Sequence, residues 1–542
     1  MPERKGIRRS DIVKHTKTLF IIITIILVLG STLTASSPIA ASTAPVHPLL
    51  LQMAAEKPDD TVAVIIQKLG DGHGLDVLVT RLGGRITQDL RIINAVAVEM
   101  PAKSVLKLSR NSAIRWISPD AAVKKSGETV PYDPIKDEDL WNVNASSFAG
   151  GRVSSTTSNI GMESPKFSGN TSGISKSFPI NLFPFTLRAF RVWASGITGR
   201  GIGVAVVDSG ITPNEDLNPV VSLSFNSSIT TTNDYYGHGT HVAGIIAGAG
   251  NLSTSHYRGL AKDVNIYNLK VNDESGMAYE SDVVAALQWI FDHKNEFNIR
   301  VVNISMNSTL EQSYNVSPLD AACEILWFNG VVVVVSAGNR TPDMAYSTIN
   351  AAPANDPFVI TVGASNENGT YVRYDDTMAS FSAFGTTQDG YAKPEILAPG
   401  KDIISILAST SPWNINHPER VVGVNYFIAS GTSMATPMVT AAVALLLQSE
   451  SNLNPDQVKY RLTHACSYIR TNDTLYPYLH LYRAIFEWRT TETSNTGLPV
   501  SQLLFTGEDP LQWGSVGWNS IGWNSVGWNS VGWNSTYWGT AP

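Results

Sequence analysis

Cysteine is nearly absent from this chain, which contains only Cys323 and Cys466 among 542 residues. Both lie in helix-like segments with apolar neighbours, a setting typical of a buried free thiol. Two free thiols are therefore the simpler interpretation. A single disulfide bond is the alternative, because sequence spacing cannot show whether the two residues meet. Two cysteines alone cannot supply a zinc-binding motif.

An excess of positive charge is also missing. The chain has 39 Lys and Arg against 46 Asp and Glu, which gives a formal net charge of -7. Such a chain lacks the electrostatic footprint of nucleic-acid binding, so we expect no nucleic-acid partner. Hydrophobic residues make up 43% of the chain and charged residues 16%. This composition is typical of globular proteins, and the length favours two folded domains plus tails.

Long apolar runs are scarce, and the one near the N-terminus is short. It covers residues 19–33, follows a basic segment that contains Arg4 to Lys17, and precedes the small-residue segment ASSPIAASTA. A run of this length is short for a hydrocarbon core about 30 Å thick, which disfavours an uncleaved membrane anchor. The layout is typical of a signal peptide, so we predict that residues 1–44 direct export and that the protein is secreted.

Three segments supply an acid, an imidazole and a hydroxyl in chain order. In GVAVVDSG, an apolar run suited to a buried parallel strand stops at Asp208. In GHGTHVAG, His238 stands at the start of a small-residue helix, with His241 one turn further on. In SGTSMATP, Ser433 stands at the N-terminus of an apolar helix, where backbone N–H groups would face an oxyanion.

Together these residue types predict nucleophilic catalysis. A serine hydroxyl is a poor nucleophile at neutral pH, an imidazole can take its proton, and a carboxylate can hold that imidazole in the right tautomer. We therefore predict Ser433 as the nucleophile, His238 as the base and Asp208 as the group that orients it. Each residue alone has a simpler interpretation, as a turn former, helix cap, satisfied polar group or metal ligand.

VVDSG, HGTHVAG and SGTSMATP resemble the three active-site motifs of the subtilisin-like serine peptidases. The resemblance assigns catalysis to His238 and not to His241. It also implies an oxyanion role for Asn339, which ends VVVVVSAGN and matches an asparagine whose side-chain N–H donates to the oxyanion in the family. Its partner would be the backbone N–H of Ser433.

The same resemblance implies two walls of a substrate pocket. In VVNISMN, Ser305 and Met306 match the strand that pairs with substrate, whereas Asn307 departs from the glycine usual there and puts the pocket width in question. The opposite wall would be Ser336, Ala337 and Gly338. These residues are small and nearly neutral, which favours an uncharged side chain before the scissile bond.

Residues 61–124 show a strand–helix–strand–strand–helix–strand pattern, which predicts a small α+β, ferredoxin-like domain. That fold hosts many functions and proves none. Ahead of a subtilisin-like domain it resembles the family's inhibitory propeptide, which would be cut by its own peptidase. Residues 125–184 include a stretch rich in Ser and Gly, so we predict a linker there.

Residues 185–488 alternate strand and helix patterns, which predicts an α/β fold with a doubly wound, mostly parallel sheet. Residues 489–512 are expected to be a second linker. In residues 513–542 a GWNSV-type repeat places Trp every five residues, a period that matches neither helix nor strand. These Trp side chains suit adhesion to envelope or glycan material, a membrane interface, self-association or an apolar groove of the catalytic domain, and we favour adhesion.

These features predict a secreted, self-processing serine endopeptidase that acts on protein or peptide substrates through an acyl-enzyme on Ser433. A catalytically silent surface-binding protein is the first alternative. An esterase is a second, but Ser433 lacks the G-x-S-x-G elbow, and a carboxyl-type serine peptidase is disfavoured by HGTHVAG. No cofactor is required for this chemistry. Structural calcium is common in the family, but no acidic loop here can be assigned to it.

Overall fold

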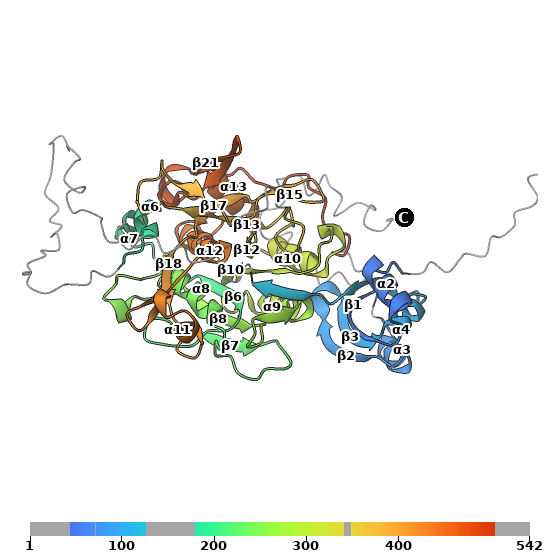
Figure 1. Ribbon diagram of the computed structural model, residues 1–542. Helices are drawn as coiled ribbons and strands as arrows, with labels where there is room; N and C mark the ends of the chain where they lie inside the picture. The colour runs from blue at the N-terminus through green and yellow to red at the C-terminus, as the bar shows by residue number, and fades with distance from the viewer. Residues whose placement is uncertain (1–43, 71, 126–178, 341–347, 505–542) are drawn as a thin grey trace, which may run out of the picture.

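The computed structural model describes residues 44–70, 72–125, 179–340 and 348–504 (Figure 1). The predicted signal peptide, most of the predicted linker and the Trp repeat lie outside the described residues.

Residues 44–125 form an N-terminal unit around an antiparallel sheet in the order β2-β3-β1-β4. The side chains of the central strand β1 alternate between the two faces of the sheet, and each face packs against a different hydrophobic core. Val64 and Ile66 join the core of this unit, whereas Ile65 joins the main core of the protein. The sheet confirms the predicted ferredoxin-like order of elements. The elements are α2 (Pro48–Glu56), β1 (Thr61–Lys68), α3 (Leu75–Arg81), β2 (Arg85–Leu90), η1 (Arg91–Ile93), β3 (Ala95–Pro101), α4 (Ala102–Leu108) and β4 (Ile114–Pro119).

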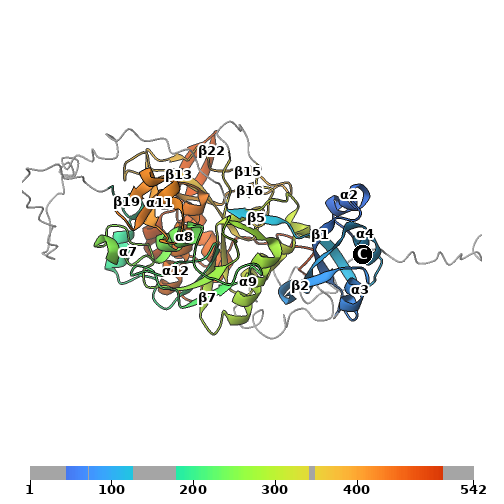
Figure 2. The same ribbon diagram turned by 60° about the horizontal axis from the view of Figure 1, so that its bottom comes forward.

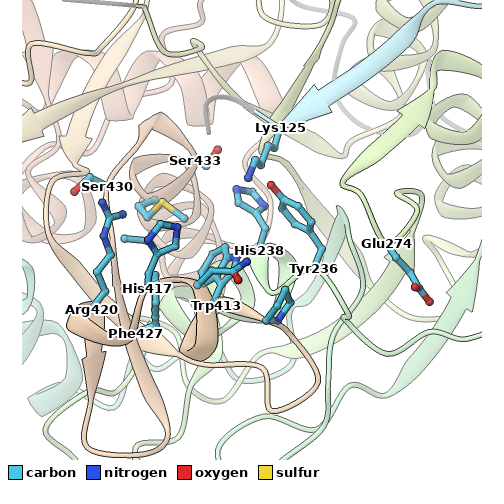
Figure 3. A pocket seen from close by; sticks show the side chains of 14 residues that line it. Lys125, Tyr236, His238, Glu274, Trp413, His417, Arg420, Phe427, Ser430 and Ser433 are labelled. Atoms are coloured by element: carbon cyan, nitrogen blue, oxygen red, sulfur yellow. The ribbon is translucent and has the colours of Figure 1, made fainter. Parts of the chain in front are cut away.

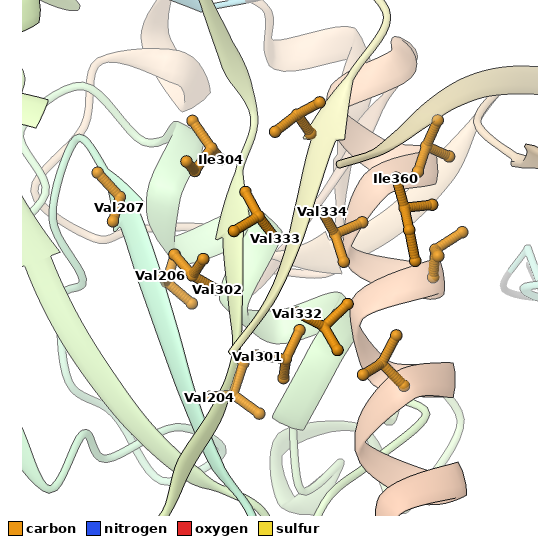
Figure 4. Close-up of a cluster of buried hydrophobic side chains, with 14 of the residues drawn as sticks. Val204, Val206, Val207, Val301, Val302, Ile304, Val332, Val333, Val334 and Ile360 are labelled. Atoms are coloured by element: carbon orange, nitrogen blue, oxygen red, sulfur yellow. The ribbon is translucent and has the colours of Figure 1, made fainter. Parts of the chain in front are cut away.

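The larger unit is built on a ten-stranded sheet, most of it in the order β17-β13-β12-β10-β6-β8-β7 with parallel pairing. The central strands β6 and β12 are valine-rich and buried throughout, and Figure 4 shows their valines beside Val301, Val302 and Ile304 of β10 and Ile360 of β13. Runs of this kind are expected where helices cover both faces of a sheet. The strands are β6 (Gly203–Asp208), β7 (Val221–Ser224), β8 (Asn265–Lys270), β10 (Ile299–Ile304), β12 (Val332–Ser336), β13 (Ile360–Asn366), β14 (Thr377–Met378), β17 (Ile396–Pro399), β21 (Ser467–Thr471) and β22 (Thr474–Tyr478).

Helices cover both faces of this sheet. The helices α8 (His238–Ala247) and α12 (Thr432–Ser449) pack against each other on one face, and α9 (Glu280–His293) and α10 (Pro318–Phe328) on the other (Figure 1). By length and composition α12 could cross a membrane, but 89% of it is buried inside the protein, as in a core helix. This arrangement confirms the predicted α/β class with a mostly parallel sheet.

The remaining elements are short and lie around these layers. They are α6 (Phe183–Thr186), α7 (Ala189–Ala194), η3 (Asn251–Ser253), η4 (Tyr314–Val316), β15 (Gly385–Thr386), β16 (Ala392–Lys393), β18 (Ile403–Ile406), α11 (Trp413–Asn416), η5 (Pro418–Arg420), β19 (Val421–Val422), β20 (Tyr426–Ala429), α13 (Pro455–His464) and the π-helix η6 (Arg483–Glu487).

A short strand joins the two units. The strand β5 (Ala122–Lys125) leaves the N-terminal unit and reaches the larger unit (Figure 2), where it lies antiparallel between β11 (Met306–Ser308) and β9 (Met277–Tyr279). The boundary predicted at 124 is therefore misplaced, because Lys125 continues this strand. Four residues carry too little periodicity for a sequence-based prediction, and the strand exists only through pairing with distant segments. The predicted linker also ends early, because α6 begins at residue 183.

The C-terminal segment that was predicted to be a linker from residue 489 instead packs on the protein as far as residue 504. The backbone N–H of Ser501 donates to both carboxylate oxygens of Glu324, at 3.0 and 2.9 Å. Leu503 and Leu504 are buried in the main core. Gln67 of the N-terminal unit donates to the Leu503 carbonyl, so this segment contacts both units.

Two truncations test this contact. A chain that ends at Pro499 loses two buried leucines and leaves the Glu324 carboxyl without its backbone donor, so its free energy of unfolding should fall by about 3 kcal/mol or more. A chain that ends at Thr506 keeps every one of these contacts and should unfold like the full chain. Thermal unfolding of the three proteins measures the difference, and equal unfolding temperatures would show that the segment contributes nothing.

Candidate active site

Asp208 and His238 meet at the carboxyl edge of the sheet. Asp208 ends β6 and His238 begins α8, and 2.8 Å separates Oδ1 of Asp208 from Nδ1 of His238. Both side chains are buried. Gly239 permits this approach, because a Cβ there would lie 2.3 Å from the Gly210 carbonyl oxygen. The structure therefore brings together the acid and the imidazole that were singled out in the sequence.

A second buried acid, which the sequence analysis did not identify, fixes the start of α8. The Asp234 carboxylate accepts from the backbone N–H groups of Gly237 at 2.6 Å and Thr240 at 2.8 Å. It also accepts from the hydroxyl of Ser209 at 2.9 Å, and that hydroxyl accepts from the N–H of Gly239. Burial raises the pKa of Asp234, and the hydrogen bonds from Thr240 and Gly237 oppose the rise. An aspartate shortly before a predicted helix start is the signal that could have shown it.

Ser433 lies in the first turn of α12 and is tied to Ser305. Pro437 has no N–H for the Ser433 carbonyl, and the Ser305 hydroxyl donates to that carbonyl instead, at 3.2 Å. The Ser433 hydroxyl in turn donates to the Ser305 carbonyl at 3.1 Å. The proline in SGTSMATP and the serine in VVNISMN therefore form one unit of structure.

A buried hydrogen-bond chain continues from this pair. Thr440 donates to the side-chain oxygen of Asn303 at 2.9 Å, and the Asn303 amide nitrogen donates to the Ser305 hydroxyl at 2.9 Å. These residues are fully buried. Asn303 and Thr440 were not singled out in the sequence, although an amide in an otherwise apolar strand is a signal of buried hydrogen bonding.

Asn339 lies beside the residue that precedes Ser433. Its side-chain oxygen accepts from the backbone N–H of Thr432 and from the Thr432 hydroxyl, both at 2.9 Å. A backbone N–H can only donate, so this contact identifies the oxygen of the amide. The amide nitrogen of Asn339 is consequently the end that donates.

The sequence model of the subtilase family matches residues 199–495, more than half of the chain. This chain belongs to the subtilase family. The match groups it with serine-type endopeptidases and covers Asp208, His238, Asn339 and Ser433.

Individual relatives agree with the family match. The chain is similar to serine protease AprX of Bacillus subtilis (strain 168), with 38% identity over 271 residues, 48% of this chain and 60% of AprX. It is similar to subtilisin DY of Bacillus licheniformis, with 32% identity over 278 residues that cover 51% of this chain and 88% of that protein. The match to AprX thus spans less than two thirds of that protein.

A solved structure resembles the fold. Fervidolysin from Fervidobacterium pennivorans, a keratinolytic enzyme related to subtilisin, superposes with a TM-score of 0.58 and 23% sequence identity. The superposition covers 81% of this chain and 62% of fervidolysin. At this identity the likeness supports the subtilase fold alone.

The two predicted pocket walls of this subtilase lie close together. Asn307 in β11 donates from its side-chain nitrogen to the Ser336 carbonyl at 3.0 Å. On the opposite wall, a Cβ on Gly338 would lie 3.7 Å from the side-chain nitrogen of Asn307. Met306 points into the main core and is fully buried, so only its backbone can face a substrate. Ser336 is also buried and Ala337 nearly so.

A pocket of about 320 Å³ opens beside His238 and Ser433 (Figure 3). On one side it is lined by Trp413, His417 and Arg420, a segment that the sequence analysis did not connect with the site. On the other side Tyr236, Glu274 and Lys125 line it. His238 and Ser433 therefore share one pocket with a residue of β5.

His241 lies outside this pocket. It is fully buried, its Nε2 lies 3.0 Å from the Phe427 carbonyl oxygen, and desolvation lowers its pKa to about 3. The imidazole therefore stays neutral and acts as a structural group.

The two cysteines are buried free thiols, which confirms the simpler interpretation of the sequence. Within the described ranges no group of three or more His, Cys, Asp or Glu side chains could hold a metal ion. The described residues therefore do not fit a calcium site built from such a group.

Replacing Ser305 tests the buried hydrogen-bond chain. In Ser305→Ala the Ser433 carbonyl loses its donor and Asn303 loses its acceptor, so the free energy of unfolding should fall by about 1 to 3 kcal/mol. Hydrolysis of a small peptide should fall too, because the first turn of α12 is no longer fixed. Thr440→Val removes only the hydrogen bond to Asn303, which is the one farthest from Ser433, and should affect hydrolysis less. If Ser305→Ala unfolds and hydrolyses the peptide like wild type, these buried hydrogen bonds do not position Ser433.

Proposed function

We propose that this subtilase hydrolyses peptide bonds with Ser433 as nucleophile, His238 as base and Asp208 as orienting acid. The observation that carries the proposal is the buried 2.8 Å contact between Asp208 and His238, with His238 and Ser433 lining the same pocket. A silent surface-binding protein would not need a buried carboxylate on an imidazole beside a serine at a helix N-terminus.

In this mechanism the Ser433 oxygen attacks the substrate carbonyl while its proton passes to His238. Asp208 holds the imidazole in the tautomer that accepts this proton and stabilises the imidazolium that forms. The side-chain nitrogen of Asn339 and the backbone N–H of Ser433 donate to the oxyanion. The imidazolium then protonates the leaving amine, and water releases the acyl group by the same route.

We further propose that the N-terminal unit is an inhibitory propeptide. Support comes from β5, which fills the gap between β11 and β9 and brings Lys125 into the pocket that His238 and Ser433 line. A substrate that pairs with β11 would need the place that β5 occupies. The unit therefore blocks the cleft until the chain is cut and the unit dissociates.

Export through residues 1–44 and adhesion through the Trp repeat remain part of the proposal. Support for them comes from the sequence alone, since both segments lie outside the described residues.

Processing of the full chain tests the proposed function. Wild type should mature to a species that begins after Lys125, whereas Ser433→Ala should keep the N-terminal unit attached because the acyl-enzyme cannot form. Ser449→Ala, at the other end of α12, is the matched control and should mature like wild type. N-terminal sequencing and intact mass after expression in a protease-free host provide the measurement. Equal maturation of Ser433→Ala would show that Ser433 is not the nucleophile.

Two carboxyl groups make the proposed inhibition sensitive to pH. Burial raises the pKa of Asp120 to about 6 and that of Asp282 to about 7. Asp120 of the N-terminal unit accepts from the backbone and hydroxyl of Ser281, and Asp282 accepts from Gln88 of that unit at 2.7 Å. When the interface opens, water reaches both carboxyls and their pKa values fall toward 3.8.

We therefore predict that the cut N-terminal unit binds more weakly as the pH rises. Below pH 3.8 both carboxyls are protonated in the bound and the free state, so neither costs binding energy. Above it the free forms lose a proton that the bound forms retain, until the pH passes about 6 for Asp120 and about 7 for Asp282. In size-exclusion chromatography of the processed chain, the share of the N-terminal unit that elutes together with the larger unit should fall over this pH range.

Asp282→Asn should flatten that pH dependence, because an amide does not titrate. Asp292→Asn is the control: it removes the surface ion pair with Arg91, 3.2 Å long, without removing a buried carboxyl. If the share of bound N-terminal unit rises with pH in wild type, Asp120 and Asp282 do not control its release.

Asn307 is expected to limit the residue that precedes the scissile bond. Because its side chain bridges the two walls, Asn307→Gly should raise kcat/KM for a peptide with a large apolar residue there by about tenfold relative to a peptide with a small one. Paired kinetics on the two peptides measure this ratio. An unchanged ratio would show that Asn307 does not line the pocket for the residue before the scissile bond.

A further inference from the structure

The side chain of Lys125 already has a binding place beside the active site. Its ammonium lies 4.1 Å from the centre of the Tyr236 ring, and Glu274 lines the same pocket (Figure 3). Its neighbour Lys124 has the same charge, but successive side chains of a strand point to opposite sides, and Lys124 is exposed. The contact therefore belongs to one position of the docked strand and not to basic residues in general.

The Tyr236 ring also packs against the turn at Gly276. Gly276 has φ +83°, and a Cβ there would lie 2.8 Å from the ring, so glycine is what lets the ring pack against this turn. The backbone N–H of Tyr236 donates at 3.2 Å to the Asp234 carboxylate, which also fixes the start of α8. The ring that faces Lys125 is therefore positioned by the structure that positions His238.

The strand register relates this place to the reacting bond. Lys125 is paired with Met306, and the residue before Met306 is Ser305, whose carbonyl accepts from the Ser433 hydroxyl. In antiparallel pairing, the residue that follows the Lys125 position in a bound chain comes opposite Ser305. The carbonyl of that following residue is then the one next to Ser433. In this chain the sequence at that point is Ser126, followed by Gly127.

We propose that Tyr236 and Glu274 form a subsite for a lysine or arginine side chain one residue before the residue whose carbonyl Ser433 attacks. The substrates of this subtilase are then peptides with a basic residue followed by a small one, since Asn307 bridges the pocket that takes the following side chain. Its first substrate is its own chain, cut between Ser126 and Gly127. This inference rests on the proposed peptidase function.

Self-processing of the full chain tests the subsite with its native occupant. Lys125→Met keeps the length of the side chain and removes its charge, and it should slow processing about fivefold or more. Tyr236→Leu should slow it similarly, and the double variant should be no slower than either single one, because both remove the same contact. Lys124→Met should slow processing far less than Lys125→Met. Wild type should yield a new N-terminus at Gly127.

Peptides added to the processed chain, after the cut N-terminal unit has been released at alkaline pH and removed, test the subsite without that unit. Two peptides that differ only in Lys or Met before the small residue should differ about fivefold or more in kcat/KM with wild type. The ratio should approach one in Tyr236→Leu and fall in Glu274→Gln, whereas Tyr374→Leu, at a ring that is 91% exposed, should keep it.

The outcomes separate the two levels of the proposal. If wild type hydrolyses neither peptide and Ser433→Ala still matures, the proposed function fails. If wild type hydrolyses both peptides equally, the function stands and the subsite is wrong. A new N-terminus at a residue other than Gly127, with a normal preference for Lys in peptides, would overturn the register alone.

Discussion

The contact between Asp208 and His238 depends on where the chain ends β6 and begins α8. A buried carboxylate is stabilised by donors, and Oδ1 of Asp208 accepts from the backbone N–H of Ser209 at 2.7 Å beside its contact with His238. Asp234 fixes the start of α8, since its two oxygens accept from the N–H groups of Gly237 and Thr240 and from the Ser209 hydroxyl. The sheet edge, the helix start and the site therefore form one hydrogen-bonded unit, and Tyr236 belongs to it through its own backbone.

Much of the fold and of the site could be predicted from the sequence because the signals are local. The valine runs of β6 and β12 indicate buried parallel strands, and Asp208, His238 and Ser433 stand at strand ends or helix starts. What could not be predicted depends on partners distant in the chain. The strand β5 is formed by pairing with β11 and β9, the segment around Leu503 is ordered by buried contacts, and the role of Ser305 follows from a carbonyl that Pro437 leaves without a donor.

The N-terminal unit contacts the larger unit through both a cation and carboxyl groups. Lys125 faces an aromatic ring and shares its pocket with an acid, whereas the partly buried Asp120 and the buried Asp282 lie where the two units meet. In the proposed function, the segment that ends in β5 presents a bond to be cut, and we expect the N-terminal unit to leave more readily once Asp120 and Asp282 ionise.

Covalent labelling of the processed chain by a fluorophosphonate tests the central claim most directly. An activated serine oxygen displaces fluoride from phosphorus, so peptide mapping by mass spectrometry shows which hydroxyl has reacted. The account predicts a single phosphonyl group on Ser433. Once an added protease has cut the linker of the variants and alkaline pH has released their N-terminal unit, labelling should be lost in His238→Gln and strongly slowed in Asp208→Asn. An adduct on another serine, or labelling of Ser433 at the wild-type rate without His238, would contradict it.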